Sequence, residues 1–201
     1  MTNYKGHLIL LHGLWNNSKI FNPLIQQIEN KGLKIHVPEF PHDYGRVDLF
    51  SLSRLLDEYI SRNLGENKKI NLLGFSMGGL IARIWLQKMN GASKTSRFIS
   101  VGSPHKGTFL AQVVPNYLLA GIAQMKRKSS LIEELNYDFS SLNDVECISF
   151  FCPWDLMVVP GWQATLPLGV KTSIPVAFHR ELITSPMAIE ILVDSILTDI
   201  N

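Results

Sequence analysis

Residues 69–90 read Lys-Ile-Asn-Leu-Leu-Gly-Phe-Ser-Met-Gly-Gly-Leu-Ile-Ala-Arg-Ile-Trp-Leu-Gln-Lys-Met-Asn, and this stretch decides the fold. Its first part is an apolar run that ends at Phe75 and predicts a buried strand. From Leu80 to Trp85, apolar residues recur at helical spacing, and Gly91 follows where a helix would end. The pattern predicts a strand, a tight turn and a helix in direct succession.

The predicted turn carries Gly74-Phe-Ser76-Met-Gly78, which fits the G-x-S-x-G pattern of a nucleophile elbow. In such an elbow the serine occupies a sharp, strained turn, so that its hydroxyl projects above the sheet. Gly74 and Gly78 lack the side chains that would collide with the neighbouring backbone. The helix that starts at Met77 would direct its positive end at Ser76, which favours negative charge developing there.

This turn has two other interpretations. Ser76 could simply cap a helix, or Gly74, Gly78 and Gly79 could form a nucleotide-binding glycine turn. A nucleotide site is expected in the first strand–helix unit, with an acidic residue about 20 positions later. Here two such units precede the elbow, and no Asp or Glu occurs from Ser76 to Ser100. The sequence therefore favours a hydrolase.

Length and composition limit the remaining possibilities. A chain of 201 residues with 46% hydrophobic and 18% charged residues predicts a single globular domain over 1–201. The net charge of +2 gives no reason to expect nucleic acid as a partner. We find neither a signal-peptide pattern nor a run of about 18 uncharged apolar residues, and a cytoplasmic location is expected.

The rest of the chain alternates between strand and helix patterns. Helices are expected at 19–31, through 52–60 with an end near Gly65, and at 186–198, where Ser185 would be the N-cap; strands are expected at 7–11, 33–37, 97–101, 147–152 and within 170–178. This alternation predicts an α/β fold whose mostly parallel sheet is covered by helices on both faces.

The two cysteines, Cys147 and Cys152, fall within one expected strand. Their odd separation directs them to opposite faces of the sheet, about 16 Å apart. A disulfide between them is therefore not expected, and two buried thiols fit a reducing compartment.

A serine nucleophile needs an adjacent base, which is itself oriented by a carboxylate. In elbow hydrolases the chain order is Ser, then Asp or Glu, then His. Of the six histidines, only His105 and His179 follow Ser76, and no acidic residue lies between Ser76 and His105. His179 is therefore the candidate base, although a surface histidine is the simpler alternative for it.

Asp155 is the candidate acid, because it follows the expected strand 147–152 directly. A turn residue is the simpler alternative for Asp155. The other acidic residues are weaker candidates: Asp138, Asp144 and Glu146 precede the strand, and Glu181, Glu190, Asp194 and Asp199 come late in the chain.

An oxyanion formed at Ser76 would need backbone N–H donors, one after the nucleophile and one in the first strand–helix loop. These would be the N–H groups of Met77 and Leu14, and Gly13 would let the first loop approach closely. His12 is expected to have a structural role in that loop.

Taken together, the chain resembles a bacterial lipase of the α/β-hydrolase superfamily, close in length to its smallest members. The resemblance lies in Leu10-Leu-His12-Gly13-Leu14-Trp15, Gly74-Phe-Ser76-Met-Gly78-Gly79, Gly102-Ser-Pro-His105-Lys-Gly-Thr108, Asp155-Leu-Met-Val-Val-Pro160 and His179. The Ser-Pro-His-x-Gly-Thr loop is the most specific of these motifs and is typical of lipases that act on acylglycerols.

The resemblance implies Ser76 as nucleophile, Asp155 and His179 as its partners, and an acyl ester of a glycerolipid as substrate. A thioesterase or acyltransferase would use the same residues, and a relative without turnover is a further alternative. Phe75 stands where such lipases often carry histidine, which changes the packing under the elbow. No cofactor and no metal is expected, and the isolated pair His42-Asp43 is expected in a solvated loop.

Residues 109–136 are a candidate cap or interfacial segment. Phe109 to Met125 carries no charge, and Lys126, Arg127 and Lys128 follow it directly. We expect contact with a lipid surface through this segment. The alternative is that its apolar residues pack against the sheet.

Overall fold

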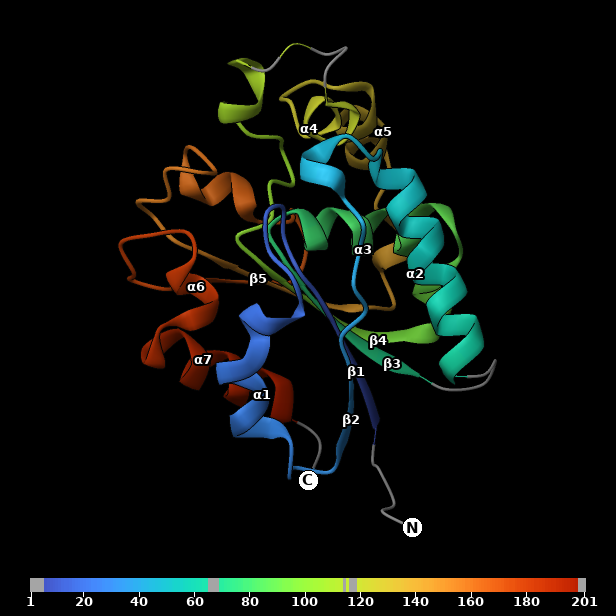
Figure 1. Cartoon of the computed structure of the whole chain (residues 1–201), viewed down its shortest axis with the longest axis vertical. Helices are drawn as coiled ribbons and strands as arrows, with labels where there is room; N and C mark the ends of the chain where they lie inside the picture. The colour runs from blue at the N-terminus through green and yellow to red at the C-terminus, as the bar shows by residue number, and fades with distance from the viewer. Residues whose placement is uncertain (1–5, 65–68, 114, 116–118, 199–201) are drawn as a thin grey trace.

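The computed structural model describes residues 6–64, 69–113, 115 and 119–198. Six strands form one sheet in the order β2-β1-β3-β4-β5-β6, and every neighbouring pair is parallel (Figure 1). The strands are β1 Gly6–Leu11, β2 Leu33–His36, β3 Ile70–Phe75, β4 Thr95–Val101, β5 Glu146–Phe151 and β6 Val170–Ser173. The predicted parallel sheet is confirmed.

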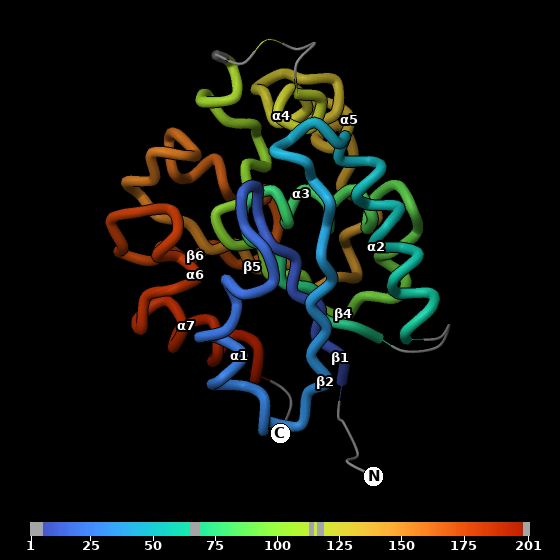
Figure 2. Tube along the Cα trace, viewed as in Figure 1, coloured from blue at the N-terminus to red at the C-terminus, as the bar shows by residue number. Residues whose placement is uncertain are grey.

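Helices cover both faces of this sheet, as predicted (Figure 2). One core contains Ile9 and Leu11 of β1 and packs against α2, α3 and α5, whereas the other contains Leu8 and Leu10 and packs against α1, α6 and α7. The α-helices are α1 Asn22–Ile28, α2 Leu49–Leu64, α3 Met77–Lys88, α4 Ala120–Gln124, α5 Ser130–Tyr137, α6 Glu181–Thr184 and α7 Pro186–Leu197. Shorter 3-10 helices are η1 Ser18–Phe21, η2 Asp43–Gly45, η3 Gly91–Lys94, η4 Leu110–Val113, η5 Ser140–Leu142 and η6 Gly161–Ala164.

One expected helix differs from the sequence prediction. The helix expected at 19–31 is divided into η1 and α1, and Pro23 near the start of α1 has no N–H with which to continue a single helix. The last strand, β6, lies within the range 170–178 expected for it; among the described strands it pairs with β5 alone, at the edge of the sheet, and it is short and mostly exposed. The helix end expected near Gly65 lies outside the described residues.

The cysteines and the last helix agree with the prediction. Cys147 is buried in the core under α3, Cys152 is buried in the core under α7, and both thiols are free. Burial raises the pKa of Cys147 to about 12. Ser185 caps α7, its hydroxyl accepting a hydrogen bond from Ala188 N. Within the described residues, no helix is long and apolar enough to cross a membrane.

Because all six strands are parallel, their carboxyl ends lie at one edge of the sheet. The loops that follow Leu11, Phe75, Val101 and Phe151 therefore meet at this edge, which is also reached by the loop between β6 and α6 (Figure 1). The candidate residues Leu14, Ser76, Asp155 and His179 belong to these loops, and Met77 begins α3 directly after Ser76.

Candidate active site

Ser76 occupies the turn between β3 and α3 with φ 54° and ψ −122°. Positive φ is uncommon for a residue other than glycine and is typical of strained functional sites. The turn is held by hydrogen bonds from Ser76 N to Val101 O (2.8 Å) and from Gly79 N to Ser76 O (3.1 Å). The structure therefore has the geometry of the nucleophile elbow expected at this position.

Gly78 allows the elbow to pack directly against the first loop. A Cβ atom at Gly78 would overlap the backbone carbonyl of Leu11, which belongs to the neighbouring strand β1. Backbone atoms cannot move aside as a flexible side chain can, so only glycine fits here.

His179 and Asp155, predicted from their order in the chain, lie in direct contact. His179 Nδ1 is 2.6 Å from Asp155 Oδ2, and the Asp155 side chain is fully buried. The other carboxylate oxygen, Asp155 Oδ1, accepts hydrogen bonds from Met157 N (2.7 Å) and Val158 N (3.2 Å). These contacts fix the carboxylate so that it can orient the imidazole.

The weaker acid candidates lie elsewhere. Asp144 is exposed ahead of β5, and Glu146, at the start of β5, pairs with Arg97. Asp138 accepts hydrogen bonds from Ser140. These positions are at the amino end of β5, whereas Asp155 follows its carboxyl end.

His179 is positioned by two residues that sequence reasoning did not assign to it. The Phe75 ring packs against the imidazole, with the ring centroids 5.0 Å apart. Glu181, one of the weaker candidates for the acid, accepts hydrogen bonds at Oε2 from Ala177 N (2.9 Å) and Phe178 N (3.0 Å). Glu181 thereby fixes the loop that carries His179. The sequence feature that could have indicated this role is an acidic residue two positions after the histidine.

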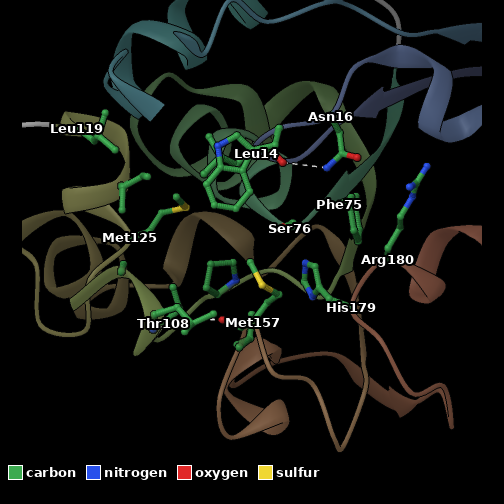
Figure 3. A pocket seen from close by; sticks show the side chains of 16 residues that line it. Leu14, Asn16, Phe75, Ser76, Thr108, Leu119, Met125, Met157, His179 and Arg180 are labelled. Carbon is green, nitrogen blue, oxygen red and sulfur yellow. Dashed lines mark hydrogen bonds between the residues drawn. The ribbon is translucent and has the colours of Figure 1, made fainter. Parts of the chain in front are cut away.

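His179 and Ser76 both line one cavity (Figure 3). His179 Nε2 is buried and makes no hydrogen bond with any described residue. Since Nδ1 is engaged by Asp155, Nε2 is the nitrogen left to exchange a proton with Ser76 or a substrate.

The loop after β1 places Leu14 beside the elbow. A Cβ atom at Gly13 would lie 2.9 Å from Ser76 Cβ, so the two loops are in close contact. Asn16 holds this turn through a hydrogen bond from Nδ2 to Leu14 O (2.9 Å). Among the described residues, neither Leu14 N nor Met77 N donates a hydrogen bond to an acceptor. Each of the two N–H groups is therefore available as a hydrogen-bond donor.

The cavity in front of Ser76 has a volume of about 640 Å³ and a mainly apolar lining. This volume is within the usual range for small-molecule sites. The lining includes Leu14, Trp15, Phe75, Pro104, Thr108, Leu110, Ala111, Leu119, Ile122, Met125, Met157 and Val158. Such a lining suits an acyl chain. Sequence reasoning did not find most of it, because the residues come from separate loops and carry no motif.

His12 has the structural role expected of it. Its Nε2 accepts a hydrogen bond from Phe40 N (3.2 Å), which places the ring proton on Nδ1, 3.1 Å from Gly13 O. Burial lowers the pKa of His12 and so favours this neutral form, even though Glu39 lies nearby. His12 thus links the loop after β1 to the loop after β2.

His42 and Asp43 are separate in their contacts. His42 Nε2 lies 3.2 Å from Asn16 O, while Asp43 pairs with Arg46 at the surface. Within the described part of the chain, no group of three or more metal-ligating side chains comes together.

His105, the other histidine after Ser76, does not line the cavity. Its ring is fully buried, lies edge-on to Phe98 and makes no hydrogen bond to the described residues. Burial, together with the nearby Arg83, lowers its pKa well below the usual value. The backbone carbonyl of His105 accepts a hydrogen bond from Arg83 Nη1 (3.2 Å), which holds the loop after β4 against α3.

The described residues of the segment 109–136 include η4, α4 and most of α5, and several of them line the cavity. Phe109 and Leu110 are exposed, whereas Ala111, Ile122 and Met125 are buried against the core. Part of the segment expected at an interface is thus a wall of the cavity. Residues 114 and 116–118 lie outside the described residues.

The comparison with family models now identifies the chain. Residues 8–147 match the model of the palmitoyl protein thioesterase family. The chain belongs to this family. The match includes the elbow and ends before Asp155 and His179. Among curated proteins, no sequence matches the chain.

Solved structures agree with this family assignment at the level of the fold. Lipase B of Aspergillus fumigatus superposes with a TM-score of 0.75 at 16% identity over 94% of this chain, which spans 52% of that protein. The mature lipase BlEst2 of Bacillus licheniformis gives 0.73 at 14% identity, covering 94% of this chain and 91% of that one. The monoacylglycerol lipase of Paleococcus ferrophilus gives 0.72 at 14% identity, with coverage of 99% and 95%.

These relatives show that the chain has the α/β-hydrolase fold. The family and the fold together make it a hydrolase-like protein suited to ester substrates.

Proposed function

We propose that the protein is a serine hydrolase that cleaves acyl esters through an acyl-enzyme on Ser76. One observation carries the proposal: His179, which Asp155 contacts at 2.6 Å, lines the same apolar cavity as the elbow serine. A serine hydroxyl becomes nucleophilic when a base beside it is oriented by a carboxylate.

The reaction proceeds in two steps. Ser76 attacks the acyl carbonyl while His179 Nε2 takes the hydroxyl proton, and Leu14 N and Met77 N donate hydrogen bonds to the oxyanion. The imidazolium returns its proton to the leaving group, which departs and leaves an acyl-serine. Water, activated by the same imidazole, then releases the fatty acid. Asp155 stabilises the imidazolium throughout.

The leaving group separates two candidate functions. A lipase acting on glycerolipids is supported by the Ser-Pro-His-Lys-Gly-Thr loop of residues 103–108 and by the apolar cavity. A thioesterase is favoured by the family match over residues 8–147. Both use the same nucleophile, and an acyltransferase would differ only in replacing water by another acceptor.

Two measurements test the proposal. Ser76 should be labelled covalently by a lipophilic organophosphonate ester, and Ser76→Ala should remove the label; a label that persists in Ser76→Ala would place the nucleophile elsewhere. Hydrolysis of palmitoyl glycerol is then compared with hydrolysis of an S-palmitoyl peptide. The two substrates share one acyl chain, but one presents an oxygen ester and the other a thioester. The substrate with the higher kcat/KM assigns the function. A series of p-nitrophenyl esters from butanoate to palmitate reports the preferred acyl-chain length.

The mechanism needs no cofactor. A lipid surface as substrate source is part of the proposal, since Phe109 and Leu110 are exposed beside the cavity. The cytoplasmic location remains a prediction from the sequence.

A further inference from the structure

A second cavity, of about 490 Å³, lies beside η4 and α4 and is not used by the proposed reaction. The cavity in front of Ser76 is mainly apolar, whereas this one is cationic and polar. Its lining includes Gln112, Lys126, Arg127, Lys128, Ser129 and Ser130, and we call it the basic cleft.

The basic cleft and the cavity in front of Ser76 share a wall. Ala111 lines the apolar cavity while its neighbour Gln112 lines the basic cleft, and Met125 and Lys126 are divided in the same way. Thr108 N donates a hydrogen bond to Met125 O (2.9 Å), which ties this wall to the loop after β4. Residues 111–112 and residues 125–126 thus each present an apolar side chain to one cavity and a polar or cationic side chain to the other.

The charge of the basic cleft has a single sign. Lys126, Arg127 and Lys128 line it together, and its described lining includes no carboxylate. Arg127 and Lys128 are exposed, and neither forms an ion pair with a described residue. A hollow lined by cations concentrates anions from solution.

The basic cleft is also held in a defined shape. Lys128 has φ +60°, a left-handed turn that reverses the chain ahead of α5. Ser129 stabilises the turn, since its hydroxyl donates to Gln124 O (2.7 Å) and accepts from Ile132 N (3.2 Å). Gln112 Nε2 donates to Arg127 O (3.2 Å), joining the two sides of the cleft. The cations therefore project from a fixed backbone.

We propose that the basic cleft is a phosphate-binding site. The guanidinium of Arg127 and the ammonium group of Lys128 offer the charged donors that phosphate oxygens accept, and Ser130 adds a hydroxyl at the rim. The phosphate could belong to an anionic lipid head group or to a soluble phosphate ester. A head group would bring the exposed Phe109 and Leu110 on the same wall against the acyl chains. The site does not depend on catalysis by Ser76.

The test compares two charge-removing double variants of the whole chain. Arg127→Gln/Lys128→Gln removes two cations from the basic cleft. Lys31→Gln/Lys34→Gln removes two exposed cations near the start of β2, at the end of the sheet opposite the carboxyl ends of the strands. Binding to phosphatidylglycerol–phosphatidylcholine vesicles is measured by co-sedimentation, with pure phosphatidylcholine as reference. Binding of glycerol 3-phosphate is measured by backbone amide NMR shifts, and circular dichroism checks folding.

The cleft variant should bind the anionic vesicles about 25-fold more weakly, at about fivefold per charge, and the control should be nearly unchanged. Ser76→Ala should bind as the wild type does, which separates this site from the proposed reaction. Glycerol 3-phosphate shifts confined to 126–130 identify a site for soluble phosphate esters, whereas vesicle binding without them identifies the lipid head group. Equal losses in both double variants, or no binding of either probe, would overturn the proposal.

Discussion

Asp155 holds His179 with one carboxylate oxygen while the other is bound by its own loop: Oδ2 lies 2.6 Å from His179 Nδ1, and Oδ1 accepts from Met157 N at 2.7 Å. The division matters because a carboxylate that is fixed by its loop can hold an imidazole in one orientation. It also separates the oxygen that is bound by the loop from the oxygen that contacts His179.

Asp155→Asn should therefore lower kcat by about 10³-fold or more while the protein stays folded. The side-chain amide oxygen can still accept a hydrogen bond from Met157 N, but the NH₂ group cannot accept a hydrogen bond from Nδ1–H and would favour the wrong tautomer of His179. Steady-state hydrolysis of a p-nitrophenyl ester measures the loss, and Asp144→Asn, at an exposed position, is the matched control. Near-native activity in Asp155→Asn would exclude Asp155 as the orienting acid.

Gly13 is expected to control the oxyanion site through its closeness to the elbow. In Gly13→Ala the new methyl group would lie 2.9 Å from Ser76 Cβ and 3.3 Å from Phe75 O, so the loop that carries Leu14 must move away. Losing one oxyanion donor lowers kcat by about 10²- to 10³-fold. We expect a loss of that size with a smaller change in KM.

Gly6→Ala is the control for this substitution, because a methyl group at Gly6 meets only a Leu33 side-chain carbon at an ordinary 3.6 Å. Comparable activity in Gly13→Ala and Gly6→Ala would argue against a Leu14 oxyanion donor.

Arg83 is expected to contribute strongly to stability, because its guanidinium is completely buried. It donates to His105 O (3.2 Å), Leu135 O (2.6 Å) and Asn136 Oδ1 (2.8 Å), and lies 4.8 Å from the centre of the Phe139 ring. It thereby joins α3 to the loop after β4 and to α5.

Arg83→Gln should lower the free energy of unfolding by about 3 kcal/mol, since hydrogen bonds from a charged group are lost in the interior. Urea unfolding measures the change. Arg62→Gln is the control, because Arg62 is exposed and its pairing with Glu58 should contribute less than about 1 kcal/mol. A similar loss in the free energy of unfolding for both variants would show that the buried contacts of Arg83 add nothing to stability.

The elbow serine and the Asp155–His179 pair show where prediction from sequence succeeds. The elbow at Ser76 is a local pattern, because strand, glycines and helix are all within residues 69–90. The pair Asp155 and His179 could be proposed from chain order, since parallel strands bring the loops at their carboxyl ends together. Each step needed only neighbouring residues or the order of elements.

Other features depend on contacts that no local pattern encodes. Apart from Gln87 on the same helix, the acceptors of Arg83 lie more than 20 residues away, at His105, Leu135 and Asn136, so a sequence reading cannot distinguish this arginine from an exposed one. The basic cleft needs Gln112 opposite Arg127, which only the packing of η4 against the turn before α5 provides.

His36 should make the protein sensitive to acid. Burial, followed by the nearby His7 and Lys34, lowers the pKa of His36 to about 4 in the folded protein. His36 Nε2 lies 3.0 Å from His7 Nδ1, and His36 Nδ1 lies 3.3 Å from the Tyr59 hydroxyl, so the neutral ring is surrounded by polar partners in the fold. In the unfolded chain the pKa of a histidine is about 6.5.

As the pH falls from about 6.5 to 4, the unfolded chain takes up this proton and the folded protein does not. The contribution of His36 is therefore present above about pH 6.5 and is lost toward pH 4, with a slope of up to about 1.4 kcal/mol per pH unit. Urea unfolding across this range should show that the free energy of unfolding falls less steeply with decreasing pH for His36→Gln than for the wild type. This holds even if His36→Gln is less stable at neutral pH. Parallel declines would mean that His36 takes up its proton equally in both states, contrary to this prediction.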